Sequence, residues 1–398
     1  MDPERFRGSP SGRAVQVQHP DGPYSAFIPA PLPPKLDMDG EPVRLAERAA
    51  HALGELSGLG RALPNPYLLI NPFIRREAVL SSRIEGTRAD LADLYAYEAG
   101  QLPLPGMEAA HESDLREVMN YVRALEYGLK RLKQMPVSLR LIREVHQRLM
   151  TGVRGERAKP GAFRTVQTYI ARAGCRGVHD APYVPPPPEH VQPALDAFEK
   201  YLHAEDDPYP FLVRLAFSHY QFEAIHPFGD GNGRIGRLLI VLQLVEGGLL
   251  SQPLLYLSAY FERHRERYCD LLLAVNERGA WREWTCFFLE GVVEQARDAV
   301  ARARSLQDLL ASWKKRIEGA TRSASALRLV DNLFAEPVLT IPRVRSILGV
   351  SYPAARRTVD KLVEIGILRQ WGESSYGRTF VAPEILEVLS RPQQPDVN

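Results

Sequence analysis

Apolar residues recur at spacings of three and four along most of this chain, a period that belongs to helices with one buried face. The pattern begins near Val43 and continues, with short interruptions, to about residue 320. The segment "NPFIRREAVLSSRIEG" is predicted to be one such helix, starting near Asn71 and Pro72 and interrupted at Gly86. The fold class expected from this pattern is mainly α, an almost entirely helical bundle.

Two stretches depart from the helical period. "FRTVQTYIARAGCRGVHDAPYVPPPP" carries β-branched and aromatic residues on both sides of a glycine-rich turn, which predicts a β-hairpin over about residues 164–184. Residues 1–22 are polar and lack periodicity, so a loose tail is expected there. The following "YSAFIPAPLPPKLDMDG" is rich in proline and is expected to run extended over the surface of another part of the protein.

The C-terminal segment has a pattern of its own, with three short helices in "SALRLVDNLFAE", "TIPRVRSILG" and "SYPAARRTVDKLVEIG". The next residues alternate in polarity and turn at Gly372 and Gly377, which predicts a two-stranded wing. Three helices and a wing describe a winged helix-turn-helix domain. Its candidate DNA contacts are Arg356, Arg357 and Lys361 on the third helix and Arg378 in the wing. Winged helices also dock proteins, so a protein partner stays an alternative to DNA for this domain.

Composition sets outer limits on the class of protein. The 398 residues exceed the usual size of one core, and 45% hydrophobic with 25% charged residues is typical of an ordinary globular protein. A net charge of +2 gives no global attraction to nucleic acid, although a local basic patch is compatible with it. Three cysteines without a CxxC pair fit a reducing cytoplasm. The first residues lack the apolar region of a signal peptide, and the most apolar run, "LLIVLQLV", is too short to span a bilayer. A cytoplasmic protein without a membrane segment is expected.

A glycine-rich loop interrupts the helical part at "HPFGDGNGRIGRLL". Gly229, Gly231 and Gly233 alternate there with an aspartate and an asparagine before an apolar helix begins, a composition that weakens a helix. Helix N-termini present unpaired N–H groups and partial positive charge, and glycines let an anion approach that backbone closely. The loop is therefore predicted to bind phosphate.

Polar side chains around this loop supply the other parts of a phosphate-transfer site. Arg234 and Arg237 are three residues apart and share a helix face, where both can hold phosphate oxygens. Asp230 offers a carboxylate to Mg²⁺, Asn232 offers an amide N–H to a phosphate oxygen, and His226 is a base that titrates near neutral pH. Each residue taken singly is more often structural than catalytic, but their combination indicates phosphoryl or nucleotidyl transfer.

Two other binding loops fit this stretch poorly. A calcium-binding EF-hand register with Asp230 at its third position would put Phe228 first and Leu239 twelfth, where calcium requires carboxylates. A Walker A loop requires GK[ST] after its glycines, and none follows here.

From His226 to Arg237 the chain matches HPFx[D/E]GNGRxxR at every defined position, and it thereby resembles the Fic family. The resemblance extends from about Tyr24 to Glu290. It implies an enzyme that moves AMP from ATP to a hydroxyl side chain of a target protein or of itself and releases pyrophosphate. The implied roles are His226 as the base, Asp230 as the Mg²⁺ ligand, Asn232 with the amides of Gly231 and Gly233 at the α-phosphate, Arg234 at the β-phosphate and Arg237 at the γ-phosphate.

The resemblance also gives a function to the predicted hairpin. In Fic enzymes a flap at this place covers the nucleotide and docks the target segment by strand addition. Here the flap would span about residues 164–184, with Gln167, Thr168 and Tyr169 on its first strand.

A second motif lies far upstream of the loop. "SSRIEG" resembles the inhibitory [S/T]xxxE[G/N] motif of many Fic proteins, with Ser81 four residues before Glu85. In those Fic proteins the glutamate of the motif pairs with the second arginine of the loop and prevents productive binding of the γ-phosphate, which implies the same role for Glu85. The plainer interpretation is a helix end at Gly86 with Glu85 paired to Arg88.

The domain organisation that follows is an N-terminal arm and inhibitory helical region (residues 1–110), a Fic core (111–318) and a winged helix-turn-helix domain (319–398). The expected function is an auto-inhibited protein AMP transferase that uses ATP and Mg²⁺. Its expected partners are a target protein with a hydroxyl side chain and, through the last domain, DNA, with a homodimer left open. The alternatives are a nucleotide-sensing transcriptional regulator and a Fic enzyme that transfers phosphate or removes AMP.

Overall fold

The computed structural model describes residues 1–20, 22–62, 66–100, 109–153, 159–171, 174–320, 323–371 and 378–392. Helices make up most of this part of the chain and the few strands form two small antiparallel sheets, which confirms the mainly α prediction. No helix within the described ranges combines the length and the apolar composition needed to cross a membrane.

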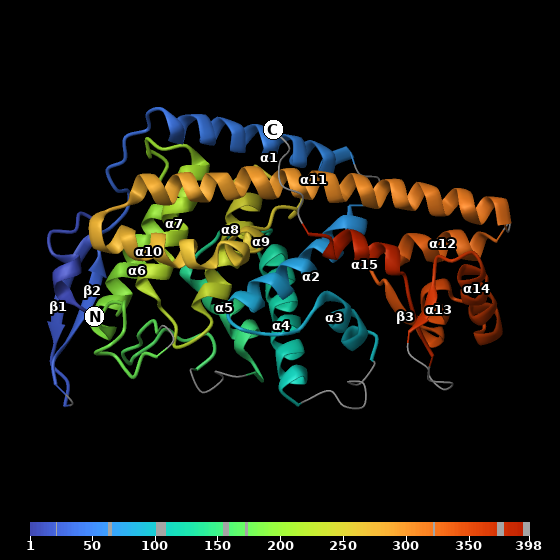
Figure 1. The fold of residues 1–398 in the computed structure, drawn as a ribbon, viewed down its shortest axis with the longest axis horizontal. Helices are drawn as coiled ribbons and strands as arrows, with labels where there is room; N and C mark the ends of the chain where they lie inside the picture. The colour runs from blue at the N-terminus through green and yellow to red at the C-terminus, as the bar shows by residue number, and fades with distance from the viewer. Residues whose placement is uncertain are drawn as a thin grey trace.

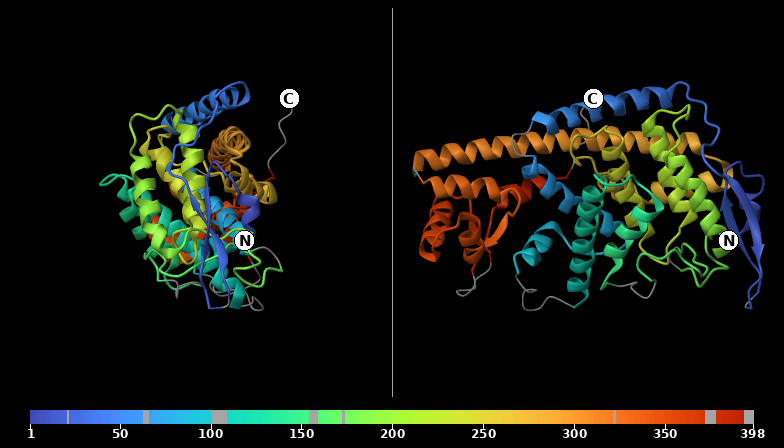
Figure 2. Two further views of the ribbon diagram at one scale, coloured as in Figure 1. Left: turned by 90° about the vertical axis from the view of Figure 1, so that its left-hand side faces the viewer. Right: turned by 180° about the vertical axis from the view of Figure 1, so that it is seen from behind.

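Eleven helices form the larger part of the described structure and share one core with the C-terminal part (Figure 1). They are α1 (Glu41–Ala62), α2 (Tyr67–Ile84), α3 (Leu91–Glu98), α4 (Ala109–Arg131), α5 (Leu139–Met150), α6 (Pro188–Leu202), α7 (Phe211–Ile225), α8 (Asn232–Glu246), α9 (Ser258–Arg263), α10 (Arg265–Arg278) and α11 (Trp281–Ala320). Helix α11 is 40 residues long, lies alongside α1, and runs from this bundle to the C-terminal part (Figures 1 and 2). Helix α11 therefore connects the larger helical bundle directly to the C-terminal part.

Helix α2 starts earlier than its sequence predicts. The expected start near Asn71 and Pro72 is wrong, because the helix begins at Tyr67 and Pro72 lies inside it. Pro66 has helical backbone angles, and its carbonyl accepts the amides of Leu69 and Ile70 at 3.1 and 3.0 Å. The helix thus begins right after one proline and tolerates a second. It ends at Ile84, just before the predicted interruption at Gly86.

The N-terminal segment is ordered, so the predicted loose tail is wrong. It forms the short helix η1 (Pro3–Phe6) and strand β1 (Gly12–Val17), and β1 pairs antiparallel with β2 (Tyr24–Pro29). Phe6 and Phe27 are fully buried, with ring centroids 5.3 Å apart, and both pack near Tyr183. The aromatic partner that stabilises this hairpin lies about 160 residues away in the sequence, which explains why local patterns do not reveal it.

The predicted hairpin over residues 164–184 is corrected to a loop with a single β-bridge. Ile170 and Tyr183 form that isolated bridge, with the Ile170 amide donating to the Tyr183 carbonyl at 3.0 Å. Residues 172–173 at its turn lie outside the described part. The second arm pairs elsewhere: the Val184 carbonyl accepts the amide of Phe27 in β2 at 2.8 Å. The second arm thus lies between the first arm and β2, because consecutive carbonyls of an extended segment point to opposite edges, and among the described residues the two arms share one bridge.

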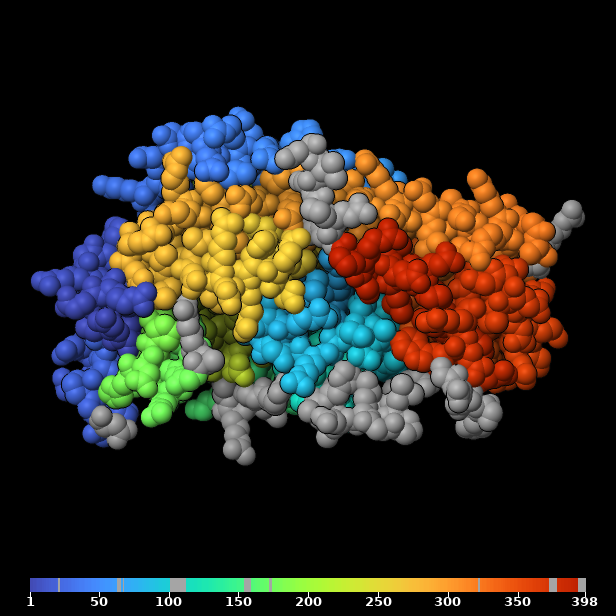
Figure 3. Space-filling view, in the orientation of Figure 1, coloured from blue at the N-terminus to red at the C-terminus, as the bar shows by residue number. Residues whose placement is uncertain are grey.

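The C-terminal part consists of α12 (Ala324–Leu333), β3 (Val338–Thr340), α13 (Ile341–Leu348), α14 (Tyr352–Glu364), β4 (Arg369–Trp371), β5 (Thr379–Val381) and α15 (Pro383–Ser390). The three predicted helices are present, and the strands form one antiparallel sheet in the order β3-β5-β4. The sequence patterns missed β3 and α15, and the predicted turn at Gly372 and Gly377 lies outside the described residues. Helix α15 packs back against α2, α3 and α11, so the C-terminal part abuts the bundle (Figure 3).

Candidate active site

The glycine-rich loop joins α7 to α8 and begins with a left-handed turn at His226. His226 has φ 49° and ψ 60°, and its amide closes the last turn of α7 by donating to the Phe222 carbonyl at 3.0 Å. A residue with a Cβ in this conformation is strained by about 1–3 kcal/mol, and such strain persists only where the surroundings enforce it. The backbone at His226 is therefore held by contacts outside its own helix.

Arg164 supplies most of those contacts. Its guanidinium donates to the carbonyls of His226 at 2.8 Å and Ile225 at 3.4 Å, and its own amide donates to the carbonyl of Pro227 at 2.9 Å. The same guanidinium reaches the Pro186 carbonyl at 2.6 Å. Arg164 is buried, and its partners are main-chain carbonyls on both sides of the turn. It ties the loop over residues 164–184 to the backbone that carries His226.

His146 in α5 supports the other side of the loop. Its ring stacks on Phe228, with centroids 3.7 Å apart and planes 3° from parallel. Nδ1 accepts the Gly161 amide at 2.8 Å, so Nε2 carries the proton and donates to the Asp230 carbonyl at 3.0 Å. Burial lowers the pKa of His146 to about 4, which keeps this neutral tautomer at neutral pH. His146 thus fixes the loop backbone without carrying charge.

Asn232 stabilises the loop through two hydrogen bonds from its side chain to the backbone of Phe228. Its side-chain oxygen accepts the Phe228 amide and its NH₂ group donates to the Phe228 carbonyl, both at 2.9 Å. Asp230 lies at the mouth of the loop with about half of its side chain exposed, and its carboxylate accepts the Gly231 amide at 2.6 Å. Gly231 has φ 79°, a left-handed conformation that suits glycine. Asn232 shapes the loop, whereas Asp230 presents a carboxylate to solvent.

The two arginines of α8 are buried and have different partners. Arg234 donates to Glu117 of α4 at 3.1 Å and contacts the Met150 sulfur. Arg237 is held by α2: its Nε donates to the Ser81 hydroxyl at 2.8 Å, and its Nη2 donates to the Ser81 carbonyl at 2.9 Å and to Glu85 Oε1 at 2.6 Å. The structure therefore brings "SSRIEG" against the second arginine of the loop, 152 residues further along the chain.

Gly233 makes room for this contact. A Cβ at this position would collide with Glu85 Oε1 and lie 2.9 Å from an Arg237 nitrogen. Glu85 therefore occupies the space directly over the first turn of α8, where helix N–H groups attract an anion. The carboxylate of Glu85 thus lies between Gly233 and the guanidinium of Arg237.

The protonation states around the loop follow from burial and from Arg237. Burial, aided by the positive charge of Arg164, lowers the pKa of His226 to about 4, so its imidazole is neutral at pH 7 and able to accept a proton. The side chain of Glu85 is 40% exposed, and its partial burial alone would raise its pKa, but the charge and hydrogen bond of Arg237 hold that pKa below its usual value. Burial raises the pKa of Glu223 in α7 to about 7, with Arg237 opposing that shift. Glu85 is thus the anion paired with Arg237 at neutral pH.

The remaining predicted residues lie outside this cluster. The Gln167 amide donates to the carbonyls of Thr168 and Pro185 at 2.9 Å, and Tyr169 is 43% exposed. The three basic residues of α14 are exposed at the far end of α11 from the loop (Figure 1): Arg356, Arg357 and Lys361. Arg378, just before β5, is half-buried.

Sequence patterns missed the residues that support the loop, namely Arg164, His146 and Glu117. One of them left a usable signal: His146 interrupts the apolar face of α5 between Ile142 and Leu149, which marks it as a buried polar group with a specific partner. Arg164 left none, because its partners are main-chain carbonyls up to 62 residues away.

The site therefore combines a glycine-rich loop at the N-terminus of α8 with a carboxylate paired to the second arginine of that helix. Residues 43–130 match the family model described as Fic/DOC family N-terminal, and residues 136–244 match the model described as Fic/DOC family. The chain therefore contains a Fic/DOC N-terminal region and a Fic/DOC domain over these two ranges.

Similar proteins agree with this assignment. The protein adenylyltransferase Fic of Culex quinquefasciatus is 29% identical over 238 residues, which cover 59% of this chain and 41% of that protein. The protein adenylyltransferase Fic of Nematostella vectensis is 30% identical over 171 residues, covering 42% and 36%. The chain thus spans less than half the length of either relative. A crystal structure of a Fic family protein from Desulfovibrio desulfuricans G20 shares the fold, with a TM-score of 0.56 and 21% identity over 88% of this chain and 98% of that one.

Proposed function

We propose that this chain is an auto-inhibited protein adenylyltransferase, which moves AMP from ATP to a hydroxyl side chain of a target protein and of itself. The observation that carries the proposal is the contact of Glu85 with Arg237 over a complete HPFGDGNGR loop. The names of the similar adenylyltransferases support the activity. Residues 1–110 would hold the arm and the inhibitory helix, 111–318 the catalytic core, and 319–398 a winged helix-turn-helix domain.

His226 acts as the general base in the proposed reaction. The target hydroxyl oxygen attacks the α-phosphorus of ATP, the bond from that phosphorus to the bridging oxygen breaks, and pyrophosphate leaves. The hydroxyl proton passes to the imidazole of His226, which is neutral at pH 7 because its pKa is lowered to about 4. Arg164 positions the base, since it holds the strained backbone of His226 by two carbonyl contacts.

The phosphates would lie over the N-terminus of α8. The amides of Gly231 and Gly233 with Asn232 would face the α-phosphate, Arg234 the β-phosphate and Arg237 the γ-phosphate. Mg²⁺ fits the exposed carboxylate of Asp230, because Mg²⁺ usually binds through one or two carboxylates plus substrate phosphates. The ion would neutralise charge on the phosphates when bound.

The target segment would dock along the loop of residues 164–184. Val166 and Tyr169 are exposed there, at 65% and 43%, while Gln167 and Thr168 lie beside them. Among the described residues the first arm forms one bridge with the second, so a target strand would pair along the other edge of that arm, where Val166 and Tyr169 are exposed.

The position of the label on ATP tests this function against its alternatives. The full chain carrying Glu85→Gly is incubated with a cell lysate and either α-³²P or γ-³²P ATP. The expected result is α-label in protein, both in the chain and in a target band, without γ-label. Protein labelled from γ-³²P would indicate phosphate transfer, and binding of ATP without any label would indicate a nucleotide sensor.

A second function, DNA binding, is favoured by the surface of α14. Arg356 and Arg357 are exposed on this helix, and Tyr352 at its start is 49% exposed. Helices α13 and α14 with strands β4 and β5 have the order of a helix-turn-helix followed by a wing. We propose that this domain holds the enzyme on duplex DNA, with Lys361 and Arg378 as further contacts.

We expect the full chain to bind duplex DNA at low salt, with an affinity that falls as salt rises. Replacing Arg356 and Arg357 together by alanine should lower the slope of log affinity against log salt by about 1 for each phosphate that the variant no longer neutralises. The matched control replaces Arg282 and Arg304, two exposed arginines of α11. Equal binding by both double variants, or no binding in a low-salt gel shift, would leave α14 without a DNA-binding function.

A further inference from the structure

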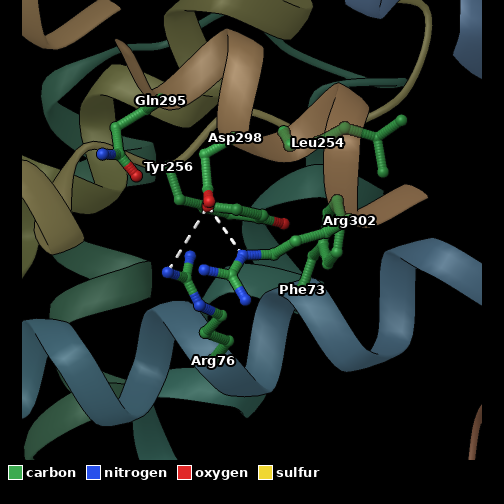
Figure 4. A pocket seen from close by; sticks show the side chains of 8 residues that line it. Phe73, Arg76, Leu254, Tyr256, Gln295, Asp298 and Arg302 are labelled. Atoms are coloured by element: carbon green, nitrogen blue, oxygen red, sulfur yellow. Dashed lines mark hydrogen bonds and ion pairs between the residues drawn. The ribbon is translucent and has the colours of Figure 1, made fainter. Parts of the chain in front are cut away.

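Helix α2 presents different side chains to two different partners. Glu77, Ser81 and Glu85 are four residues apart and share the face that meets Arg237. Arg76 belongs to another face, about 100° around the helix from Glu77. That face looks toward α11 (Figure 4), and Arg76 also lines a pocket with Leu389 and Ser390 at the end of α15. The inhibitory helix is thus held from a second side, away from the nucleotide loop.

The second partner is Asp298 of α11. Its Oδ2 accepts Arg302 Nε at 2.7 Å and lies 3.5 Å from Arg76 Nη2, so one oxygen serves two guanidinium groups (Figure 4). Asp298 and Arg302 are buried, and Arg76 is mostly buried. The cavity beside them is about 10 Å³, roughly the space of one water, so the three side chains are packed without room for a ligand.

Arg302 connects this cluster to the C-terminal part. Its Nη1 donates to the carbonyls of Val388 at 2.5 Å and Leu389 at 3.2 Å, and its Nη2 donates to the carbonyl of Arg391 at 2.7 Å. These carbonyls lie at the C-terminus of α15, where helix geometry leaves them unpaired and where a cation is favourable. Arg302 is therefore both the C-terminal cap of α15 and the partner of Asp298.

Charge makes Asp298 the residue on which the contact depends. Two guanidinium groups share its carboxylate. Burial, with the nearby charge of Arg302, lowers the pKa of Arg76 to about 10, while Asp298 opposes that shift. Without the carboxylate, two buried cations would face each other across α2 and α11. The resulting repulsion would act on α2 two to three turns before Glu85.

We propose that the Arg76–Asp298–Arg302 cluster links the C-terminal part to the inhibitory helix, so that the seating of α15 sets how firmly Glu85 holds Arg237. This proposal rests on the proposed auto-inhibition. It assigns the C-terminal part a regulatory function: displacing α15 from α11 releases Arg302 from its carbonyls, loosens Asp298 and frees α2. A ligand of the C-terminal part that moves α15 would thereby activate the enzyme.

Asp298→Asn in the full chain tests the link. We expect self-AMPylation to rise at least fivefold over wild type, and amide hydrogen exchange to become faster in α2 near Ser81 and Glu85. In a Glu85→Gly background the same change should add nothing, because the inhibitory carboxylate is already absent. The matched control is Glu55→Gln, which breaks the exposed Glu55–Arg304 pair between α1 and α11 and should leave the rate unchanged.

The outcomes separate this proposal from the auto-inhibition on which it rests. If Glu85→Gly raises the rate and Asp298→Asn does not, the link is wrong and auto-inhibition stands. An equal rise with and without Glu85 would also overturn the link, because the effect would then bypass the inhibitory contact. If Glu85→Gly itself has no effect, both ideas fail. If Asp298→Asn does not fold, the self-AMPylation rate of Arg302→Lys is measured in its place, and the same rise is expected. Lysine keeps the charge of Arg302 but cannot reach Asp298 and three carbonyls at once.

Discussion

Replacing His226 with alanine is expected to lower AMP transfer by about 10²–10⁴-fold, the usual contribution of a positioned general base. The variant is best measured in a Glu85→Gly background, where the wild-type inhibition does not mask the loss. Its physical basis is the neutral imidazole at the start of the loop, on a backbone that Arg164 holds in a left-handed turn. The measurement is the initial rate of incorporation of α-³²P from ATP into the protein.

The binding of ATP provides the control for this loss. Nucleotide affinity should survive His226→Ala within a few-fold, because the loop amides and Arg234 remain. His203→Ala, at an exposed histidine that follows α6, removes an imidazole elsewhere and should leave the rate unchanged. A His226→Ala protein that binds ATP and transfers AMP at the unmodified rate would exclude His226 as the base.

Replacing Glu85 with glycine is expected to raise self-AMPylation at least about tenfold, equivalent to roughly 1.4 kcal/mol of lost competition for Arg237. The Glu85 carboxylate lies 2.6 Å from Arg237 Nη2 and directly over Gly233, so it and a γ-phosphate oxygen compete for one guanidinium. Glu85 caps the end of α2 with helical backbone angles, next to Gly86, so the backbone there accommodates glycine. The measurement is the rate of self-labelling from α-³²P ATP at saturating nucleotide.

Two companion variants show whether the gain comes from the arginine. Arg237→Ala combined with Glu85→Gly should abolish the rise, since the freed guanidinium is then missing. Glu85→Gln keeps the size and a hydrogen-bond acceptor but removes the charge, so its rate should fall between wild type and Glu85→Gly. A well-folded Glu85→Gly protein that labels no faster than wild type would return Glu85 to the status of an ordinary helix end.

The nucleotide loop could be located from sequence because its chemistry is contiguous. Base, carboxylate, glycines and arginines lie within twelve residues, from His226 to Arg237, and the helix that follows begins where the glycine pattern indicates. Ser81 and Glu85 were identified by resemblance to a motif, because nothing local to α2 points to a partner 152 residues away.

Local patterns failed where the partner of a segment is distant in the sequence. The hairpin over residues 12–29 has polar residues around it, and one of the two aromatic rings that pack on Phe27, that of Tyr183, comes from a distant segment. The second arm of the predicted hairpin over residues 164–184 likewise has a distant partner, since the Val184 carbonyl accepts the Phe27 amide of β2 while Tyr183 bridges to Ile170. Pairing between strands is decided by which edge is free and buried, and a single strand's composition does not contain that information.

By itself, the sequence determined the helical class of this protein, the position of its glycine-rich loop and the residue types present there, because period, glycine content and side-chain chemistry are local properties. The tertiary structure alone decided which groups hold that loop and helix α2 in place. Arg164 donates a hydrogen bond to the carbonyl of His226. Asp298 pairs with Arg76 of α2 and with Arg302 of α11, and Arg302 in turn binds carbonyls at the end of α15. These contacts use main-chain oxygens or shared charges between distant segments, so their energy exists only once the chain has folded around them.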